Sequence, residues 1–499
     1  MPSSHKMILI VISLSREIFI KSVNFLHLIF PVNPRLLSIC LIKCNYFILY
    51  KALIMHFGEK LGHSKKKNSM GILSSLTREQ KEAVGLLQIG TFLEYFDLML
   101  YVHMAVLLNE LFFPKTDPHT ASLIAAFAFC STYVLRPIGA LLFGWVGDNI
   151  GRKPTVVITT IMMALSCIVM ANLPTYAQVG ITASWVITIC RIMQGLSAMG
   201  EVIGAEIYLT EVIPLPHRYP VVSAIRIVDD LGSVFAIGVA SFVTLAGMNW
   251  RIAFWVGACI AVVGSIARVT LRETPEFIAA KGKKSCINGA VEKVQLKTAI
   301  AYFLMHCGYP IFFFFSFVFC ASILKNKFGY SSDQIIHHNF IIALVALVSD
   351  VFYTVLSKRI FPLKILTFKV YFAFILSLLL PFFLNTIEDP IHLLIVQCLV
   401  IFFALGGMPA SAVFLVNFPV LKRFKAATFL YALAYAVMST INSFGLIYLV
   451  EFFGNYGLYV ITLPICIGFY WSITHFKKLE KEAGNFPSSQ KPDGLNIKC

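Results

Sequence analysis

Several acidic residues stand inside long apolar stretches of the chain, where an ionised carboxylate is costly. Such a carboxyl can bind and release a proton, because burial and nearby charges decide which of its two forms is stable. The candidates are Glu94, Asp97, Glu201, Glu206, Asp229, Asp230 and Asp350. This pattern is typical of a proton-binding site. The alternative is a structural network in which each acid pairs with an arginine.

Arginines stand inside the same apolar stretches. Glu94 and Asp97 are three residues apart, so they are expected to share one face of a helix. Arg136 is the expected partner that modulates their proton affinity, while Arg191 and Arg226 are further cations in these stretches. A proton-coupling cavity is therefore predicted around Glu94, Asp97, Arg136, Glu201 and Asp229.

The composition predicts the elements that position these residues. Of 499 residues, 58% are hydrophobic and 13% are charged, the latter about half the share of a soluble domain. This excludes an ordinary soluble enzyme, a disordered chain and a nucleic-acid-binding protein. Long apolar runs predict an all-α membrane protein. Its twelve transmembrane helices are expected near 84–108, 120–146, 154–173, 180–209, 220–246, 250–270, 298–324, 337–357, 364–386, 391–416, 426–450 and 455–475.

Basic residues gather in alternate gaps between these spans. Arg152 with Lys153, and Arg423 with Lys425, are examples, whereas the gap at 172–182 carries no charge. The positive-inside rule then places both termini in the cytoplasm. A cytoplasmic linker at 271–297 separates two six-helix halves, 84–270 and 298–475, and 476–499 is expected to be a cytoplasmic tail.

The first 70 residues differ from the rest. They hold ten basic and two acidic residues, a net charge of +8, and two apolar stretches interrupted by charges. Neither stretch has the clean apolar core and small-residue cleavage site of a signal peptide. We interpret 1–70 as an N-terminal extension from a wrongly chosen start codon, with Met55 or Met70 as the true start. The alternative is an additional membrane-surface segment.

Other classes of function lack their motifs. The twelve cysteines include no C-x-x-C pair, so neither a metal site nor a disulfide framework is expected, and no cofactor is predicted. The chain has no G-x-S-x-G, H-E-x-x-H or phosphate-loop motif. Its loops are too short for a nucleotide-binding domain. An enzyme and an ATP-driven pump are therefore not expected.

Two motifs carry a resemblance to a known family. The stretch 144–154 reads GWVGDNIGRKP and resembles the loop signature G-x-x-x-D-x-x-G-R-[RK] of the major facilitator superfamily. The stretch 191–195 reads RIMQG and resembles its R-x-x-Q-G signature. The resemblance implies the two-half fold of that superfamily. It also implies gating roles for Gly144, Asp148, Gly151, Arg152, Lys153, Arg191, Gln194 and Gly195.

Further blocks narrow the resemblance to the metabolite:proton symporter branch, which includes bacterial proline/glycine-betaine transporters. The blocks are EYFD at 94–97, FFP at 112–114, LRPIG at 135–139, GE at 200–201, WRI at 250–252 and RETPEF at 272–277. The branch implies proton symport of a small polar solute across a bacterial inner membrane. The solute is a proline- or betaine-like zwitterion or an organic acid. Protons, the solute and lipid are the expected partners, and no oligomer is required.

Two features leave alternatives open. The second-half counterpart of the loop signature, near 355–362, lacks both the acid and the glycine, and Lys358 stands near the acid's place. A non-transporting paralogue or membrane solute sensor is therefore the rival function. Phenylalanines at 312–315 and 317 favour either a lipid-facing surface or a cation–π cage walled by Tyr95, Tyr101 and Tyr309.

The interpretation of 1–70 generates a prediction about truncation. A chain that starts at Met55 should insert into the membrane with unchanged topology, because all the motifs above lie downstream of it. Reporter fusions at the C-terminus of the full and shortened chains measure this. Loss of insertion in the shortened chain alone would show that the first 54 residues are required.

Overall fold

The computed structural model describes residues 76–114, 133–215, 217–245, 248–269, 272–286 and 293–486. The predicted N-terminal extension and residues 487–499 of the predicted tail lie outside the described residues. The chain divides into two units between Lys81 and Glu82, and the account below concerns the second unit, Glu82–Cys499.

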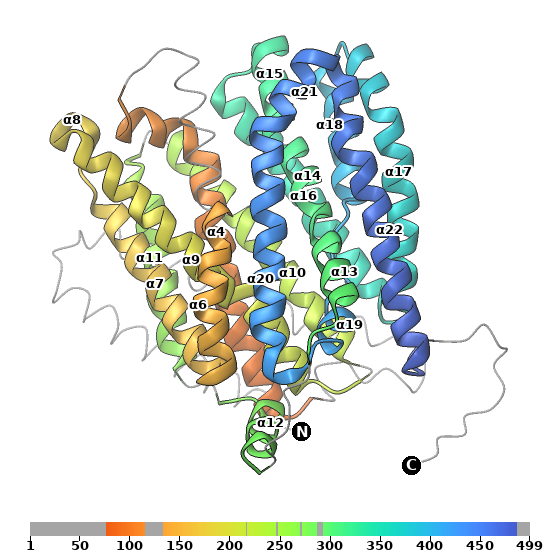
Figure 1. The fold of residues 1–499 in the computed structure, drawn as a ribbon. Helices are drawn as coiled ribbons and strands as arrows, with labels where there is room; N and C mark the ends of the chain where they lie inside the picture. Colours follow the sequence, from red (N-terminus) through yellow and green to blue (C-terminus); the bar gives the residue numbers. More distant parts are fainter. Residues whose placement is uncertain are drawn as a thin grey trace, which may run out of the picture. The chain divides into compact units, whose positions relative to one another are not determined.

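Every regular element in the described part of the chain is helical (Figure 1). We call α4 to α11 the N-terminal helix group and α13 to α22 the C-terminal helix group; α12 (Pro275–Cys286) lies between them in the sequence. The N-terminal helix group consists of α4 (Arg78–Phe112), α6 (Arg136–Asn149), α7 (Arg152–Asn172), α8 (Tyr176–Val179), α9 (Ile181–Val212), α10 (Arg218–Leu245) and α11 (Arg251–Arg268).

The C-terminal helix group contains more short and irregular pieces. It includes two π-helical turns, η1 (Phe315–Phe319) and η2 (Ile441–Gly445), and one 3₁₀ turn, η3 (Gly454–Gly457). Its α-helices are α13 (Leu296–His306), α14 (Gly308–Phe314), α15 (Cys320–Phe328), α16 (Ser332–Leu356), α17 (Pro362–Thr386), α18 (Pro390–Phe402), α19 (Ser411–Val416), α20 (Val420–Thr440), α21 (Leu446–Phe453) and α22 (Leu458–Glu482).

The helices agree in position with the predicted spans. Each of the predicted spans overlaps at least one helix. Among the described residues, eight helices are long and apolar enough to cross a membrane, and Arg251–Val262 and Pro390–Phe402 form shorter apolar helices. Residues 115–132, which make up much of the second predicted span, lie outside the described part. The all-helical membrane class is thus confirmed, and the count of twelve stays a prediction.

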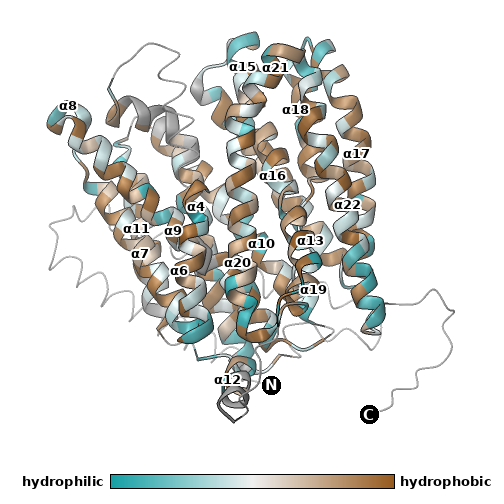
Figure 2. Ribbon diagram, viewed as in Figure 1, coloured by the Kyte–Doolittle hydropathy of each residue, from teal (hydrophilic) through white to brown (hydrophobic). Residues whose placement is uncertain are grey.

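Large apolar side chains cover much of the outer surface of these helices. On α17, Tyr371, Ile375, Leu379 and Phe382 are exposed, and Figure 2 shows hydrophobic residues along the lengths of the helices. An apolar surface of this extent is unfavourable in water and suits contact with lipid tails. Lys369 of the same helix is 5% exposed, so its charge lies on the inner side.

The two helix groups contact each other through a few helices. In the N-terminal group, α10 packs against α16, and α6 and α9 pack against α20; Figure 1 shows α20 beside α6. The short α19 contacts both α9 and α10. These contacts bring charged residues that are more than a hundred positions apart in the sequence into one interior.

The tenth predicted span is interrupted, so the prediction of one continuous helix over 391–416 is wrong. Helix α18 ends at Phe402 and α19 begins at Ser411. Gly406, Gly407 and Pro409 occupy the break, and these residue types interrupt helices because glycine is flexible and proline lacks an N–H donor. The Ser223 hydroxyl of α10 donates to the Pro409 carbonyl at 3.1 Å, which satisfies one backbone acceptor of the break.

Candidate functional site

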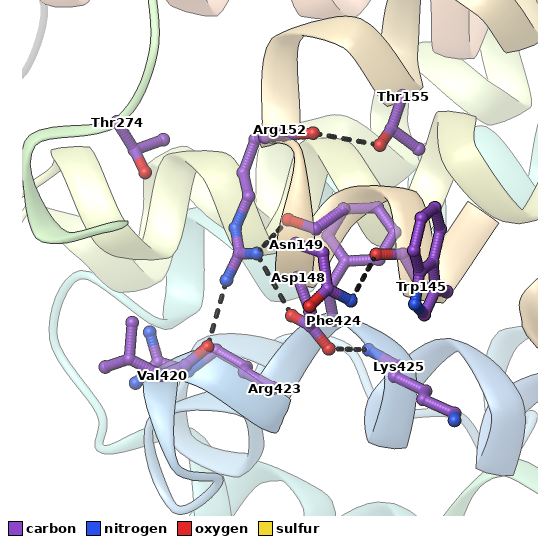
Figure 3. A network of polar contacts seen from close by, with 12 residues as sticks. Trp145, Asp148, Asn149, Arg152, Thr155, Thr274, Val420, Arg423, Phe424 and Lys425 are labelled. Atoms are coloured by element: carbon purple, nitrogen blue, oxygen red, sulfur yellow. Dashed lines mark hydrogen bonds and ion pairs between the residues drawn. The ribbon is translucent and has the colours of Figure 1, made fainter. Parts of the chain in front are cut away.

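Arg152, at the start of α7, joins the loop after α6 to the C-terminal helix group. The sequence places it among the basic residues of a connecting loop, whereas the structure buries its side chain completely. Its Nη1 atom donates to the Gly147 carbonyl and, at 3.0 Å, to Asp148 Oδ1. Its Nη2 atom donates to the Val420 carbonyl of α20 at 3.0 Å (Figure 3). A single guanidinium thereby links the two helix groups.

Asp148 binds α20 directly. Its Oδ1 atom forms the ion pair with Arg152, and its Oδ2 atom accepts a hydrogen bond from the backbone N–H of Lys425 at 2.9 Å (Figure 3). A cation and a backbone N–H near the start of a helix are both favourable partners for a carboxylate. Loss of its charge would weaken the contact between α6 and α20.

A second carboxylate, Glu211 at the end of α9, lies between two arginines. Its Oε1 atom accepts from Arg152 Nη2 and from Arg423 Nη1, each at 3.2 Å, and its side chain is fully buried. Its Oε2 atom accepts from the Thr274 hydroxyl at 2.8 Å. Arg423 of α20 also pairs with Glu276 of α12 at 3.1 Å. We call Asp148, Arg152, Glu211, Glu276 and Arg423 the cross-group network.

Two glycines of the loop signature stand where a side chain has no room. A Cβ atom on Gly144 would lie 2.9 Å from the Cα atom of Lys425, so the glycine permits α6 and α20 to approach closely. A Cβ atom on Gly151 would collide with the carboxylate of Glu273. That carboxylate accepts hydrogen bonds from the first backbone N–H groups of α7, those of Arg152 at 3.0 Å and Lys153 at 3.3 Å.

Beyond the cross-group network, a cavity lies between the two helix groups. On α9, Glu206 lines the cavity and Glu211 belongs to the network; on α20, Arg423 belongs to the network and Tyr431 lines the cavity. Eight residues of helix span about 12 Å, so the network lies a short distance along these helices from the cavity. We call it the central cavity, and its charged lining residues are Glu206, Arg226, Asp230, Asp350 and Lys369.

Arg226 of α10 is the cation with the most contacts in the central cavity. Its Nη1 atom donates to the Tyr95 hydroxyl at 2.6 Å and to Asp229 Oδ2 at 3.3 Å. Its Nε atom is 4.0 Å from Asp350 Oδ2 of α16. Arg226 therefore binds acids from both helix groups, and Asp229, one of the predicted cavity residues, is its fully buried partner.

Aromatic rings of the predicted cation–π cage hold the protein's own arginines. The Arg226 guanidinium lies 4.9 Å from the Tyr309 ring centroid and 5.3 Å from that of Tyr95, and Arg191 lies 3.7 Å from that of Tyr101. The phenylalanines at 312–315 and 317 are buried rather than lipid-facing. Phe313 and Phe314 line a second cavity, which shares Tyr309 and Tyr435 with the central cavity.

Asp97 faces the interior of the N-terminal helix group. It is 2% exposed, and its Oδ1 atom accepts from Cys167 Sγ of α7 at 3.1 Å. The cation that acts on it is Arg191 of α9, which corrects the expectation that Arg136 is its partner. Arg191 in turn donates to Gln194 Oε1 at 2.9 Å. The arginine of the R-x-x-Q-G signature thus acts on the first-span acid and is bonded to the glutamine of the same signature.

Glu94 interacts with a different arginine from the one that acts on Asp97. Its carboxyl is buried and acts electrostatically on Arg136, whose guanidinium lies 4.5 Å from the ring centroid of Tyr133. Arg136 lines the second cavity, together with Tyr95 of the first span. Neither Glu94 nor Asp97 is among the residues that line the two cavities described here.

Two other predicted site residues have simpler surroundings. Lys153 is half-buried and contributes its backbone N–H to Glu273. Gly195 is buried within α9. The side chain of Glu201 lies outside the described residues.

Comparison with known proteins places this arrangement in a family. The sequence profile of the Major Facilitator Superfamily matches residues 87–447. The chain belongs to this superfamily. A Haemophilus influenzae protein named for metabolite transport is 31% identical over 378 residues, which cover 71% of this chain and 86% of that protein. The proline/betaine transporter of Escherichia coli K12 is 32% identical over 204 residues, 40% of this chain and 41% of the transporter.

Solved structures agree with the superfamily fold. The proton:xylose symporter XylE, bound to a bromodeoxyglucose, superimposes with a TM-score of 0.66 at 16% identity and covers 80% of this chain and 95% of XylE. The human organic anion transporter MFSD10 gives a TM-score of 0.60 at 15% identity, over 80% of this chain and 100% of that chain. At these identities the likeness concerns the fold alone.

Sequence reasoning missed several residues of the site. Glu211 lies just after the predicted span 180–209 and is not singled out by the sequence, Arg423 is predicted only as part of a basic gap, and nothing in their spacing indicates that they meet. Lys369 gave a signal that was overlooked, because it is a cation inside the apolar run 364–386. In the structure it lines the central cavity, with its Nζ atom 4.4 Å from the ring centroid of Tyr353.

The cross-group network predicts a large effect of neutralising Glu211. Glu211→Gln leaves two buried arginines without their shared carboxylate, and breaking a buried ion pair in this way costs about 3 kcal/mol or more. The midpoint of thermal unfolding in detergent should therefore fall clearly below that of the native protein. Glu451→Gln, at an exposed position of α21, is the control and should leave the midpoint unchanged. Equal midpoints for both variants would show that the network contributes little to stability.

Proposed function

We propose that this superfamily member is a proton-coupled symporter of a small polar organic solute, working by alternating access. The observation that carries the proposal is the central cavity, which is lined by charges from both helix groups, with the cross-group network a short distance away along α9 and α20. A charged cavity between two helix groups, beside a contact that can join or release those groups, is what a carrier needs to bind a polar solute from one side at a time.

The relatives support the class of solute. The Escherichia coli protein is named as a proline/betaine transporter, and the Haemophilus influenzae protein for metabolite transport. The cavity contains cations for a carboxylate group, Arg226 and Lys369, and acids for an ammonium group. The proposed solute is therefore a proline- or betaine-like zwitterion, with an organic acid as the alternative within the same class of carrier.

The proposed topology follows the superfamily and the charge pattern. We infer twelve transmembrane helices in two six-helix halves, 84–270 and 298–475, with the linker 271–297 and both termini in the cytoplasm. The bacterial inner membrane is the proposed location, because a relative that is 34% identical over 45% of this chain is named as an inner membrane metabolite transport protein. The cross-group network would then be the cytoplasmic gate.

A transport assay in proteoliposomes tests this function. Radiolabelled L-proline, glycine betaine and succinate are offered with and without an imposed inward proton gradient. Accumulation of one of them only with the gradient supports proton symport. Equal uptake with and without the proton gradient would refute the coupling.

A non-transporting solute sensor is the second candidate, favoured by the missing acid and glycine near 355–362, where Lys358 and Arg359 are exposed. It predicts binding of a solute without uptake. Equilibrium binding of the same three labelled solutes to the purified protein, measured beside the uptake assay, separates the two candidates.

Neutralising the gate acid should slow transport without weakening binding. Asp148→Asn keeps the shape of the side chain but removes the charge that pairs with Arg152 at 3.0 Å. Solute exchange should fall by about tenfold, the size of a typical coupling energy, while the dissociation constant changes little. Glu482→Gln, on the exposed end of α22, is the control. A large loss of affinity with normal exchange would mean that Asp148 belongs to the solute site.

The first-span acids are the proposed carriers of the coupled proton. Asp97 is buried against Arg191 and Cys167, so a change in its protonation state alters the charge balance inside the N-terminal helix group. Asp97→Asn should abolish accumulation against a gradient but spare solute exchange, because exchange requires no net release of a proton. Glu94→Gln is tested in parallel, and the exposed Glu388→Gln is the control. Undiminished accumulation in both variants would move the coupling site elsewhere.

A further inference from the structure

Two acids from different helix groups meet in the central cavity. Asp230 of α10 and Asp350 of α16 both line it, and their carboxyls are within hydrogen-bonding range of each other. Two ionised carboxylates repel at such a distance and neither can donate, so a hydrogen bond between them requires a proton on one of them. The proximity of the two carboxyls in one cavity therefore favours a bound proton.

The surrounding charges favour the same conclusion. Four carboxyls, those of Glu206, Asp229, Asp230 and Asp350, line the cavity or pair with its lining, against the two cations Arg226 and Lys369. The carboxyls exceed the cations by two, in an interior where uncompensated charge is costly. Proton uptake is the simplest way to remove the excess.

Asp230 also has unused hydrogen-bonding capacity. It is 5% exposed, and its Oδ2 atom has no hydrogen-bond partner among the described residues. Arg226 is occupied by Tyr95 and Asp229, and its Nε atom is 4.0 Å from Asp350. No cluster of three or more His, Cys, Asp or Glu residues suited to a metal ion occurs in the described part of the chain. A proton fits this site better than a metal ion.

Groups from several elements line the central cavity around the pair or act on the side chains beside it. Those that titrate or carry charge are Glu94 and Tyr95 of α4, Glu206 of α9, Arg226 and Asp229 of α10, His306 of α13, Tyr309 of α14, Tyr353 of α16, Lys369 of α17, and Tyr431 and Tyr435 of α20.

We infer that Asp230 and Asp350 share one proton, and that this proton joins the two helix groups across the central cavity. Loss of the proton leaves two carboxylates in contact and drives α10 and α16 apart at this point, so occupancy of the pair biases the carrier between closed and open arrangements. The inference rests on the proposed function for its role in transport, but the proton site itself does not. This proton site is separate from Asp97. The partners of Asp97 described above, Cys167 and Arg191, both belong to the N-terminal helix group.

Infrared difference spectroscopy of the purified full chain tests the site without any solute. The native protein should show a protonated-carboxyl C=O band that disappears as the pH is raised. Asp350→Asn and Asp230→Asn, changed on different helices, should each remove the same band, whereas Asp350→Glu should keep it and Glu388→Gln should leave it unchanged. If one of the two Asn variants fails to fold, the other still shows whether the band belongs to the pair. Persistence of the native band in a folded Asn variant would overturn the inference.

Two further readouts distinguish a bound proton from a bound metal cation. The thermal midpoint of the native protein should fall as the pH rises, because the folded state holds a proton that the unfolded chain releases, and this dependence should be flatter in Asp350→Asn. Adding Na⁺ at constant pH should leave the band unchanged; its loss on adding Na⁺ would mean a metal-cation site and overturn the inference. If the band behaves as expected but none of the solutes is accumulated, the proton site stands and the proposed function fails.

Discussion

A buried carboxylate shared by two arginines holds the two helix groups together at one end of the molecule. Glu211 of α9 accepts hydrogen bonds from Arg152 of α7 and Arg423 of α20, and all three side chains are almost completely removed from solvent. Because an uncompensated charge in this environment is costly, each partner depends on the others being present. Because of this dependence, the three side chains are expected to pair or separate together. Such concerted behaviour is the property that a gate requires.

In the central cavity, too, an uncompensated charge is costly, but there the charges are not fully compensated. In the cross-group network each carboxylate has a cation beside it, whereas the cavity contains more carboxyls than cations. An imbalance of this kind is unfavourable unless protons or a cationic group of a solute enter. The structure thus combines a charge cluster in which every carboxylate is paired with an arginine and a cavity that is lined by more carboxyls than cations, which is suited to binding.

Aromatic rings take part in both regions. Arg152 lies 4.6 Å from the ring centroid of Phe277, and Arg226 lies over Tyr309 at 4.9 Å. A ring face stabilises a cation without requiring a second acid, so the arginines are held while neighbouring carboxyls stay available. The tyrosines that the sequence suggested as walls of a solute cage are therefore already engaged by the protein itself, and a solute would have to compete with Arg226 for them.

The sequence by itself determined the membrane class, the approximate positions of the helices and the superfamily. Those features depend on local properties, namely the length of apolar runs, the spacing of glycines and charges in 144–154, and the placement of basic residues. It also singled out Asp97, Arg191 and Arg226 as charges inside apolar stretches. It did so because the cost of a buried charge can be recognised without knowing its partner.

Only the tertiary structure decided which charges meet. Asp97 is matched with Arg191 rather than Arg136, Glu211 with Arg423, and Asp230 with Asp350, across separations that no local pattern encodes. The break between α18 and α19 was likewise hidden, since Gly406, Gly407 and Pro409 lie in an otherwise apolar run. The physical reason is common to all of these. A pairing is set by the packing of whole helices, and the sequence specifies that packing only through many weak contacts acting together.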